Sequence, residues 1–205
     1  MTALRRLSSS VFAGILLVGV AWTDTTASRK AGPSHEGDVP ESATSPARQY
    51  FTDVTLVNQD GERLRLYSDL LKGKVVVINA FYTTCTGVCP PLNRNMLEIQ
   101  KTLGDRLGQA VHLISITVDP GTDTTPRLKE YAKRYQAKPG WHFVTGKKED
   151  VDLALYKLGY LSETKEVHSN VILMGNDRTG LWKKTFGLAN VKDLLEVFES
   201  VLNDG

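Results

Sequence analysis

The sequence predicts an α/β domain in which a mixed central sheet carries helices on both faces. From about residue 74 to residue 158, apolar β-branched runs alternate with segments of helical periodicity. A hairpin pattern and one more helical segment then complete the chain. Alternating strands and helices build a parallel sheet, and a terminal hairpin adds antiparallel strands to it.

Residues 1–22 are interpreted as a signal peptide or an N-terminal membrane anchor. Arg5 and Arg6 precede the apolar run 11–22, VFAGILLVGVAW. A basic start followed by a short apolar core is typical of an export signal. The run is shorter than the about 20 apolar residues of a spanning helix, and residues 25–27 fit a cleavage site poorly. Both a cleaved signal and an uncleaved anchor therefore stay open.

Residues 23–48 are expected to be a flexible linker that precedes the domain of residues 49–205. The segment is rich in Ser, Thr, Pro, Gly and charged residues and has almost no large apolar ones. Such a composition cannot bury enough surface to offset the entropy cost of ordering. The linker would hold the domain away from the membrane, tethered or soluble, in the periplasm or on the extracytoplasmic face. The near-neutral net charge of +2 and the lack of Lys/Arg runs exclude a nucleic-acid partner.

The first expected element of the domain is a hairpin, with strands at 54–57 and 63–66 around an Asp60-Gly61 turn. The run 74–82, KVVVINAFY, predicts a central strand that is buried on both faces. Apolar residues at helical spacing then predict a helix that ends at Gly104. The remaining expected elements are strand 111–118, a helix capped by Thr124, strand 141–144, helix 148–158, a hairpin of 167–174 and 181–186, and helix 191–202.

The motif Cys85-Thr-Gly-Val-Cys89-Pro90 lies between the predicted central strand and its helix. A strand that runs into a two-cysteine turn and a helix is how a thioredoxin-like fold begins its active site. The helix N-terminus stabilises a thiolate, so a lowered thiol pKa is expected. The three residues between the cysteines, one more than in redox thioredoxins, leave room for a metal. Two soft thiolates favour Cu(I), with zinc as the competitor.

A copper site of this kind needs a third ligand, and histidine is the natural choice. His168 stands at the entry to a predicted strand, after a polar loop that would lie beside the cysteine loop. His35 falls in the linker and is incidental. His112 is interpreted as a surface-facing or hydrogen-bonded strand residue, and His142 is ambiguous. On spacing alone, a solvated loop histidine at position 168 stays the alternative.

Four segments together resemble the SCO/SenC family. They are FYTTCTGVCP (81–90), SITVDPGTDTTPRLKEYAKRY (115–135), WHFVTG (141–146) and HSNVILMGNDRTG (168–180). The resemblance extends from about Phe51 to the C-terminus, and the N-terminal anchor and linker fit it as well. It implies a thioredoxin fold and copper held by Cys85, Cys89 and His168. It also implies a role in assembling the CuA site of cytochrome c oxidase, and it places Asp119 near the ligands without making it one.

Two functions use these residues. A copper metallochaperone would hold Cu(I), with Cu(II) as an open alternative, and would pass it to the CuA subunit or to another copper or thiol protein. A thiol–disulfide oxidoreductase would use Cys85 as the attacking thiol and Cys89 as the resolving one, so enzymatic activity stays open. His168 discriminates between the two. A peroxidase would need a Thr or Ser and an Arg around its cysteine, and Thr83 and Arg94 form no such pattern.

Overall fold

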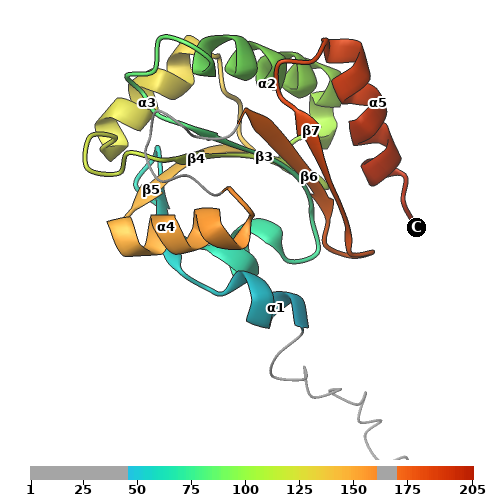
Figure 1. Ribbon diagram of the computed structural model, residues 1–205, viewed down its shortest axis with the longest axis horizontal. Coiled ribbons are helices and arrows are strands. Elements are labelled where there is room, and N and C mark those ends of the chain that lie inside the picture. Colours follow the sequence, from blue (N-terminus) through green and yellow to red (C-terminus); the bar gives the residue numbers. More distant parts are fainter. Residues whose placement is uncertain (1–45, 161–169) are drawn as a thin grey trace, which may run out of the picture. The chain divides into compact units, whose positions relative to one another are not determined.

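The computed structural model describes residues 46–160 and 170–205, which form a layered α/β structure (Figure 1). Its centre is a seven-stranded sheet with the order β2-β1-β5-β4-β3-β6-β7. The strands are β1 Thr55–Asn58, β2 Arg63–Arg65, β3 Val75–Phe81, β4 Val111–Thr117, β5 Trp141–Gly146, β6 Val171–Asn176 and β7 Leu181–Phe186. The helices are α1 Pro46–Phe51, η1 Leu66–Leu71, α2 Cys89–Leu103, η2 Gly104–Arg106, α3 Thr125–Arg134, α4 Lys148–Lys157 and α5 Val191–Leu202.

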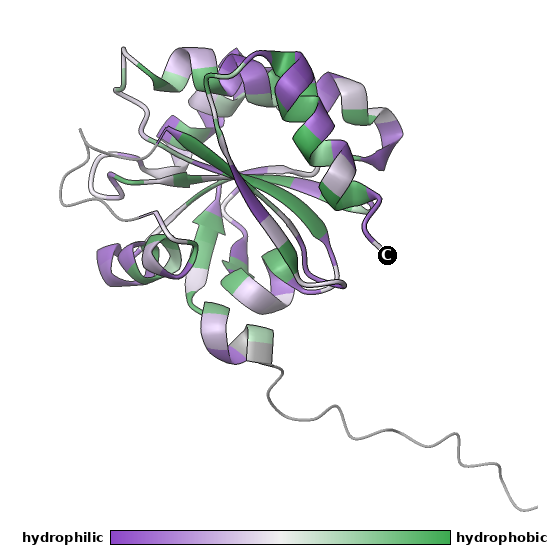
Figure 2. Ribbon diagram, turned by 45° about the vertical axis from the view of Figure 1, so that its right-hand side comes forward, coloured by the Kyte–Doolittle hydropathy of each residue, from purple (hydrophilic) through white to green (hydrophobic). Residues whose placement is uncertain are grey.

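The sheet is mixed, as predicted. β3, β4 and β5 run parallel to one another, whereas β6 pairs antiparallel with β3 and β1 pairs antiparallel with β5. Helices α2, α3 and α5 cover one face and α4 lies on the other (Figure 1). Hydrophobic residues run along the central strands, and the helices carry both hydrophobic and hydrophilic residues (Figure 2). The predicted fold class is therefore confirmed.

The central strand β3 is buried along its whole length. Val75, Val77 and Phe81 belong to the core under α2 and α5, and Val76 and Ile78 belong to the core of the opposite face. Successive side chains of a strand point to opposite faces, so a continuous apolar run requires cover on both. The run KVVVINAFY fixes β3 as the middle of the sheet for this reason.

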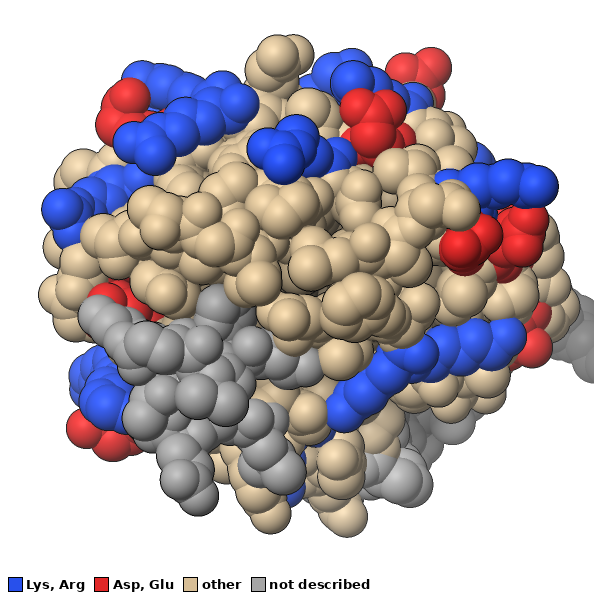
Figure 3. Space-filling view, turned by 45° about the horizontal axis from the view of Figure 1, so that its top comes forward, with Lys and Arg blue, Asp and Glu red and all other residues tan. Residues whose placement is uncertain are grey.

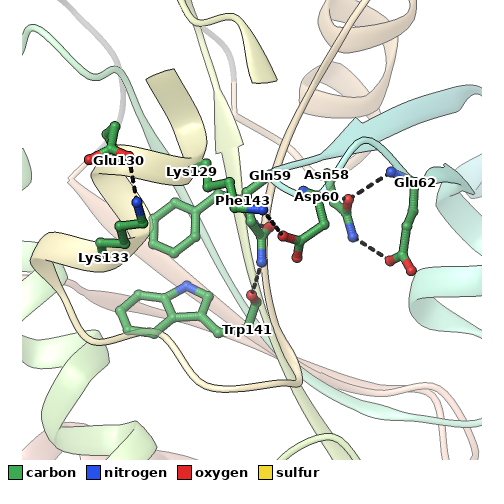
Figure 4. Close-up of polar contacts among 9 residues, drawn as sticks. All are labelled: Asn58, Gln59, Asp60, Glu62, Lys129, Glu130, Lys133, Trp141 and Phe143. Atoms are coloured by element: carbon green, nitrogen blue, oxygen red, sulfur yellow. Dashed lines mark hydrogen bonds and ion pairs between the residues drawn. The ribbon is translucent and has the colours of Figure 1, made fainter. Parts of the chain in front are cut away.

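The side chain of Gln59 extends the pairing between β1 and β5. Its amide donates a hydrogen bond to the Trp141 carbonyl (3.0 Å) and accepts one from the Phe143 N–H (2.8 Å) (Figure 4). Asn58 stabilises the turn that contains Gln59, because its side-chain oxygen accepts hydrogen bonds from the N–H groups of Asp60 and Glu62 (3.0 and 2.9 Å). The backbone groups of β5 beyond the end of β1 are thus satisfied by a side chain.

The predicted elements are found within two residues of their expected bounds except for one strand, and the described residues also contain the short helices α1, η1 and η2, which were not predicted. Helix α1 crosses the expected boundary at residue 48, because Phe51 packs on Tyr67 and Trp182. The short helix η1 shows no clear helical spacing of apolar residues in the sequence. The strand expected from residue 167 is β6, which begins at Val171 after the undescribed residues 161–169. Residues 1–22 also lie outside the described part of the chain. Among the described residues, no helix is long and apolar enough to span a bilayer.

Two histidines form a pair on neighbouring strands. The rings of His112 and His142 stack with centroids 5.7 Å apart, and the Nδ1 atom of each is buried without a hydrogen-bond partner among the described residues. Burial, the charge of Lys74 and the neighbouring His142 ring lower the pKa of His112 to about 4. Burial likewise lowers the pKa of His142, although Glu62 and Asp60 oppose the shift. The expectation that His112 is a surface or fully hydrogen-bonded residue is only partly met.

The low pKa of His112 makes stability depend on pH. The unfolded chain takes up the proton near pH 6.5 and the folded chain only near pH 4, so protonation favours unfolding in that window. We expect the free energy of unfolding of the wild type to fall from pH 7 to pH 4.5 by about 1 kcal/mol more than that of His112→Gln, since the ring is only partly desolvated. Urea titration at both pH values measures the difference, and an equal fall in the two proteins would contradict it.

Candidate metal centre

The two cysteines lie where β3 gives way to α2. β3 ends at Phe81, a tight turn follows in which the Cys85 N–H donates to the Tyr82 carbonyl (3.2 Å), and α2 begins at Cys89. The two cysteines form no disulfide with each other in this structure. Cys85 is 9% exposed and Cys89 1% exposed, so Cys85 is the one that the solvent can reach. The order strand, cysteine turn and helix agrees with the prediction.

The N-terminus of α2 supplies a hydrogen bond to sulfur. The preceding residue, Val88, provides no side-chain cap, and the prolines at positions 90 and 91 have no N–H to offer. The Leu92 N–H is already bonded to the Val88 carbonyl (3.1 Å). The Cys89 N–H donates instead to the Cys85 sulfur (3.4 Å). Cys85 Sγ therefore takes the place of the missing cap at the positive end of the helix dipole.

The two thiols are driven to different protonation states. Burial by itself raises the pKa of Cys85, but hydrogen bonds from the Cys89 thiol and from the Cys89 and Gly87 N–H groups outweigh it, and that pKa is lowered. Burial raises the pKa of Cys89 far above its ordinary value, and its hydrogen bond to Cys85 raises it further. Of the two thiols, Cys85 is therefore the one that loses its proton first, and Cys89 is the one that keeps it. A lowered pKa was predicted for the motif, whereas the split between the two sulfurs was not.

A buried carboxylate ties the cysteine loop to the sheet. Asp123 is fully buried, and both of its oxygens accept hydrogen bonds from the Thr83 N–H (3.2 and 3.1 Å). The Thr83 hydroxyl also donates to Asp123, and the Thr117 hydroxyl donates to the second oxygen (2.5 Å). Since Thr83 follows β3 and Thr117 ends β4, Asp123 clamps the two strand ends beneath Cys85. The sequence analysis missed this residue, although it stands four positions after Asp119.

Asp119, the residue expected beside the ligands, follows β4 directly. It is half-buried, and its N–H donates to the Thr117 hydroxyl (2.9 Å). Its carbonyl accepts the N–H groups of Thr122 and Asp123 (3.0 and 2.9 Å), which closes the turn that presents the Asp123 carboxylate. The structure thus brings Asp119 to the same sheet edge as Cys85, because β3 and β4 run parallel and end together.

A chain of buried polar side chains supports α2 from behind. Asn79 of β3 donates to Asn93 of α2 (3.1 Å), which donates to the Tyr131 hydroxyl of α3 (3.0 Å). Ser115 of β4 donates to Asn79 (2.6 Å) and accepts from the indole of Trp141 (3.0 Å). A fully satisfied network of this kind fixes one arrangement of its elements. The single Asn within the apolar run 74–82 was the only sequence signal for it.

The third predicted ligand, His168, lies outside the described residues. Within residues 46–160 and 170–205, no three His, Cys, Asp or Glu side chains come together as metal ligands. His112 and His142 lie near the start of β4 and β5, and His112 pairs with Val76 near the start of β3. The cysteines follow the end of β3, so neither of these histidines reaches them. The role of His168 stays a prediction.

The Asp123 clamp can be tested through one of its donors. Thr117→Val keeps the shape of the side chain but removes the hydroxyl that serves Asp123 and the Asp119 N–H. We expect the free energy of unfolding to fall by about 1–3 kcal/mol, because a buried carboxylate loses a donor. The matched control, Thr102→Val on the exposed face of α2, should change it by less than about 0.5 kcal/mol. Equal losses in urea titrations of the two variants would contradict the clamp.

The asymmetry of the thiols predicts selective modification. Iodoacetamide should label Cys85 first, because Cys85 is the more exposed residue and the thiolate is the reacting species. Its rate should reach half of its maximum at a lower pH than that of a free cysteine, since a lowered pKa keeps the thiolate populated there. Mass spectrometry of the cysteine peptide measures both sites, with urea-unfolded protein as the control. Equal labelling of the two cysteines in the folded protein would contradict the assignment.

Comparison with known proteins adds the family. The family model described as SCO1/SenC matches residues 42–193. The SCO1 protein homolog of Bacillus subtilis is 35% identical over 102 residues, which cover 49% of this chain and 51% of the relative. A protein of Stutzerimonas stutzeri, provisionally named as copper-binding, is 27% identical over 141 residues, covering 64% and 67% of the two chains. The chain spans about half the length, or less, of the first curated relatives it matches.

A solved structure shows the same architecture. BsSco, a member of the Sco family of cytochrome c oxidase assembly proteins with a disulfide switch, superposes with a TM-score of 0.61 at 26% identity. The match covers 76% of this chain and 94% of that one. The thioredoxin-like fold is therefore confirmed. Since the family model spans most of the chain, including the cysteine motif, the Asp123 clamp and β6, this protein belongs to the SCO1/SenC family.

Proposed function

We propose that this protein is a copper metallochaperone that holds copper through Cys85, Cys89 and His168 and helps to assemble the CuA site of cytochrome c oxidase. The observation that carries the proposal is the pair of free sulfurs at the start of α2, of which Cys85 accepts a helix N–H and has a lowered pKa. A thiolate and a neighbouring thiol that can lose its proton to a metal are the donors that Cu(I) prefers.

The residues present fit copper as a transferable cargo. The cysteines stand on a turn at the edge of the sheet, with Cys85 partly open to solvent. A site with few ligands on such a turn leaves room for a recipient thiolate to join before the copper leaves. The provisional name of the Stutzerimonas stutzeri relative and the oxidase-assembly role of the Sco family of BsSco support this interpretation.

A second candidate function is thiol–disulfide exchange with a partner protein. The asymmetry of the cysteines favours it, because the less buried thiol, whose pKa is lowered, attacks and the more deeply buried thiol resolves. Cys85 would attack a partner disulfide, and Cys89 would release the partner as a dithiol while the Cys85–Cys89 disulfide forms. Two electrons and two protons then pass to the partner. Both roles would take place on the extracytoplasmic side, tethered or soluble according to the fate of residues 1–22.

Anaerobic Cu(I) titration of the reduced full chain against a competing chelator tests the proposal. We expect one tightly bound copper per chain, with thiolate-to-copper absorption, and loss of that binding in Cys85→Ser/Cys89→Ser. His168→Ala should weaken binding strongly, whereas His35→Ala, which removes an imidazole from the expected linker, should leave it unchanged. Unchanged affinity in His168→Ala would overturn the three-ligand site.

The same variants separate the two candidate functions. His168→Ala should keep its rate of disulfide exchange with glutathione disulfide, because the exchange needs only the two sulfurs. If the wild type binds no copper but exchanges disulfides rapidly, the oxidoreductase is the correct function.

A further inference from the structure

A pocket of about 350 Å³ adjoins the cysteine loop. Thr83 and Thr84, the two residues before Cys85, form one side of it, and Arg127, Glu130, Tyr131 and Arg134 of α3 form the other. The backbone of this loop is held by the Asp123 clamp, so the pocket has one fixed wall. Whatever occupies it contacts the two residues that precede Cys85 in the chain.

The charge of the pocket is positive once the internal ion pairs are counted. Lys133 pairs with Glu130 (2.6 Å), and Lys129 outside the pocket pairs with Asp60 (3.2 Å), as Figure 4 shows. The hydrogen bond from Lys133 keeps the pKa of Glu130 below its ordinary value, so that carboxylate stays charged and engaged. The one acidic residue of the pocket is therefore already neutralised by a lysine of its own helix.

The two arginines are less engaged: within the described residues neither contacts a carboxylate at ion-pair distance, although the charge of Arg134 also acts on Glu130. Arg127 donates to the Thr122 carbonyl (3.3 Å), and Arg134 lies over the Tyr131 ring, 5.9 Å from its centroid. Neither makes an ion pair within the described residues. A guanidinium that stacks on a ring keeps its edge free, and that edge can bind a carboxylate with two hydrogen bonds. In Figure 3, Lys and Arg side chains lie at the upper left, the side on which α3 is found, and also at the top and right of the view, with acidic side chains among them.

We propose that this pocket docks an acidic segment of the protein that receives copper or exchanges thiols with this one. The identity of this partner rests on the proposed function. The pocket adds where the partner would bind and that its carboxylates would be recognised. Carboxylates held by Arg127 and Arg134 lie on the α3 side of the loop, and the partner's cysteines next to that segment then face Cys85. The arginines also offset the repulsion between the acidic partner and the Cys85 thiolate.

Two synthetic peptides that differ only in charge test the proposal. Each carries one cysteine linked to thionitrobenzoate through a disulfide, flanked by four Glu residues in one peptide and by four Gln in the other. The Cys85 thiolate attacks the peptide sulfur, a mixed disulfide forms, and the thionitrobenzoate anion leaves and is measured by its absorbance. With the reduced, metal-free full chain at low salt, the Glu peptide should react about tenfold faster than the Gln peptide.

The ratio of the two rates isolates docking from the intrinsic reactivity of Cys85. In Arg127→Gln/Arg134→Gln the ratio should fall to about one, and in Arg127→Lys/Arg134→Lys most of it should survive. The control Lys101→Gln/Lys192→Gln removes the same charge from α2 and α5 and should keep the wild-type ratio.

A wild-type ratio near one would overturn the pocket, and so would an equal loss in the arginine-to-glutamine variant and the control. If the glutamine variant fails to fold, the lysine variant and the salt dependence of the wild-type ratio decide. No copper is present in this assay, so the ratio of the two rates can be interpreted even if the protein proves not to bind copper.

Discussion

The residues of β3 from Val75 to Phe81 are buried on both sides of the sheet, and the arrangement of the other elements follows from that constraint. A strand with two apolar faces must be covered by helices on both. The cover above it includes α2, which begins eight residues after the strand ends. The short connection brings the cysteine turn to the carboxyl edge of the sheet, where the helix N-terminus meets it.

The chemistry of the site comes from the different surroundings of the two cysteines at that edge of the sheet. Cys85 lies in the turn and receives N–H groups, whereas Cys89 is inside the first turn of α2 and is almost fully buried. The two sulfurs of one short motif thus have opposite pKa shifts. The proposed metal transfer and the alternative disulfide exchange would both use this asymmetry, because each needs one sulfur that ionises readily and one that the protein holds in place. Under the proposed function, the predicted third ligand His168 and the partner would decide which reaction occurs.

The pieces around the cysteines act together. Asp123 clamps Thr83 to β4, and the same turn leads into α3, whose arginines lie on the far side of the neighbouring pocket. The loop that holds the sulfurs is thereby also one wall of the surface on which a partner would lie. The proposed docking pocket and the cysteine turn therefore adjoin the same strand ends, where buried hydrogen bonds fix the backbone.

The sequence by itself determined the layered fold, the central strand and the cysteine motif at the start of a helix. It also carries the resemblance to the SCO/SenC family, which predicts His168 as the third ligand. These are local patterns: a long apolar run, helical spacing and a short motif are visible without a partner. Only the tertiary structure decided that Asp123 clamps the loop, that Asn79 begins a buried polar network, and that Arg127 and Arg134 border a pocket beside Cys85. Each of these includes contacts between residues far apart in the sequence, such as Thr83 with Asp123 and Asn79 with Ser115, which meet because β3 and β4 lie side by side. The periodicity of the sequence does not indicate which distant residues meet in this way.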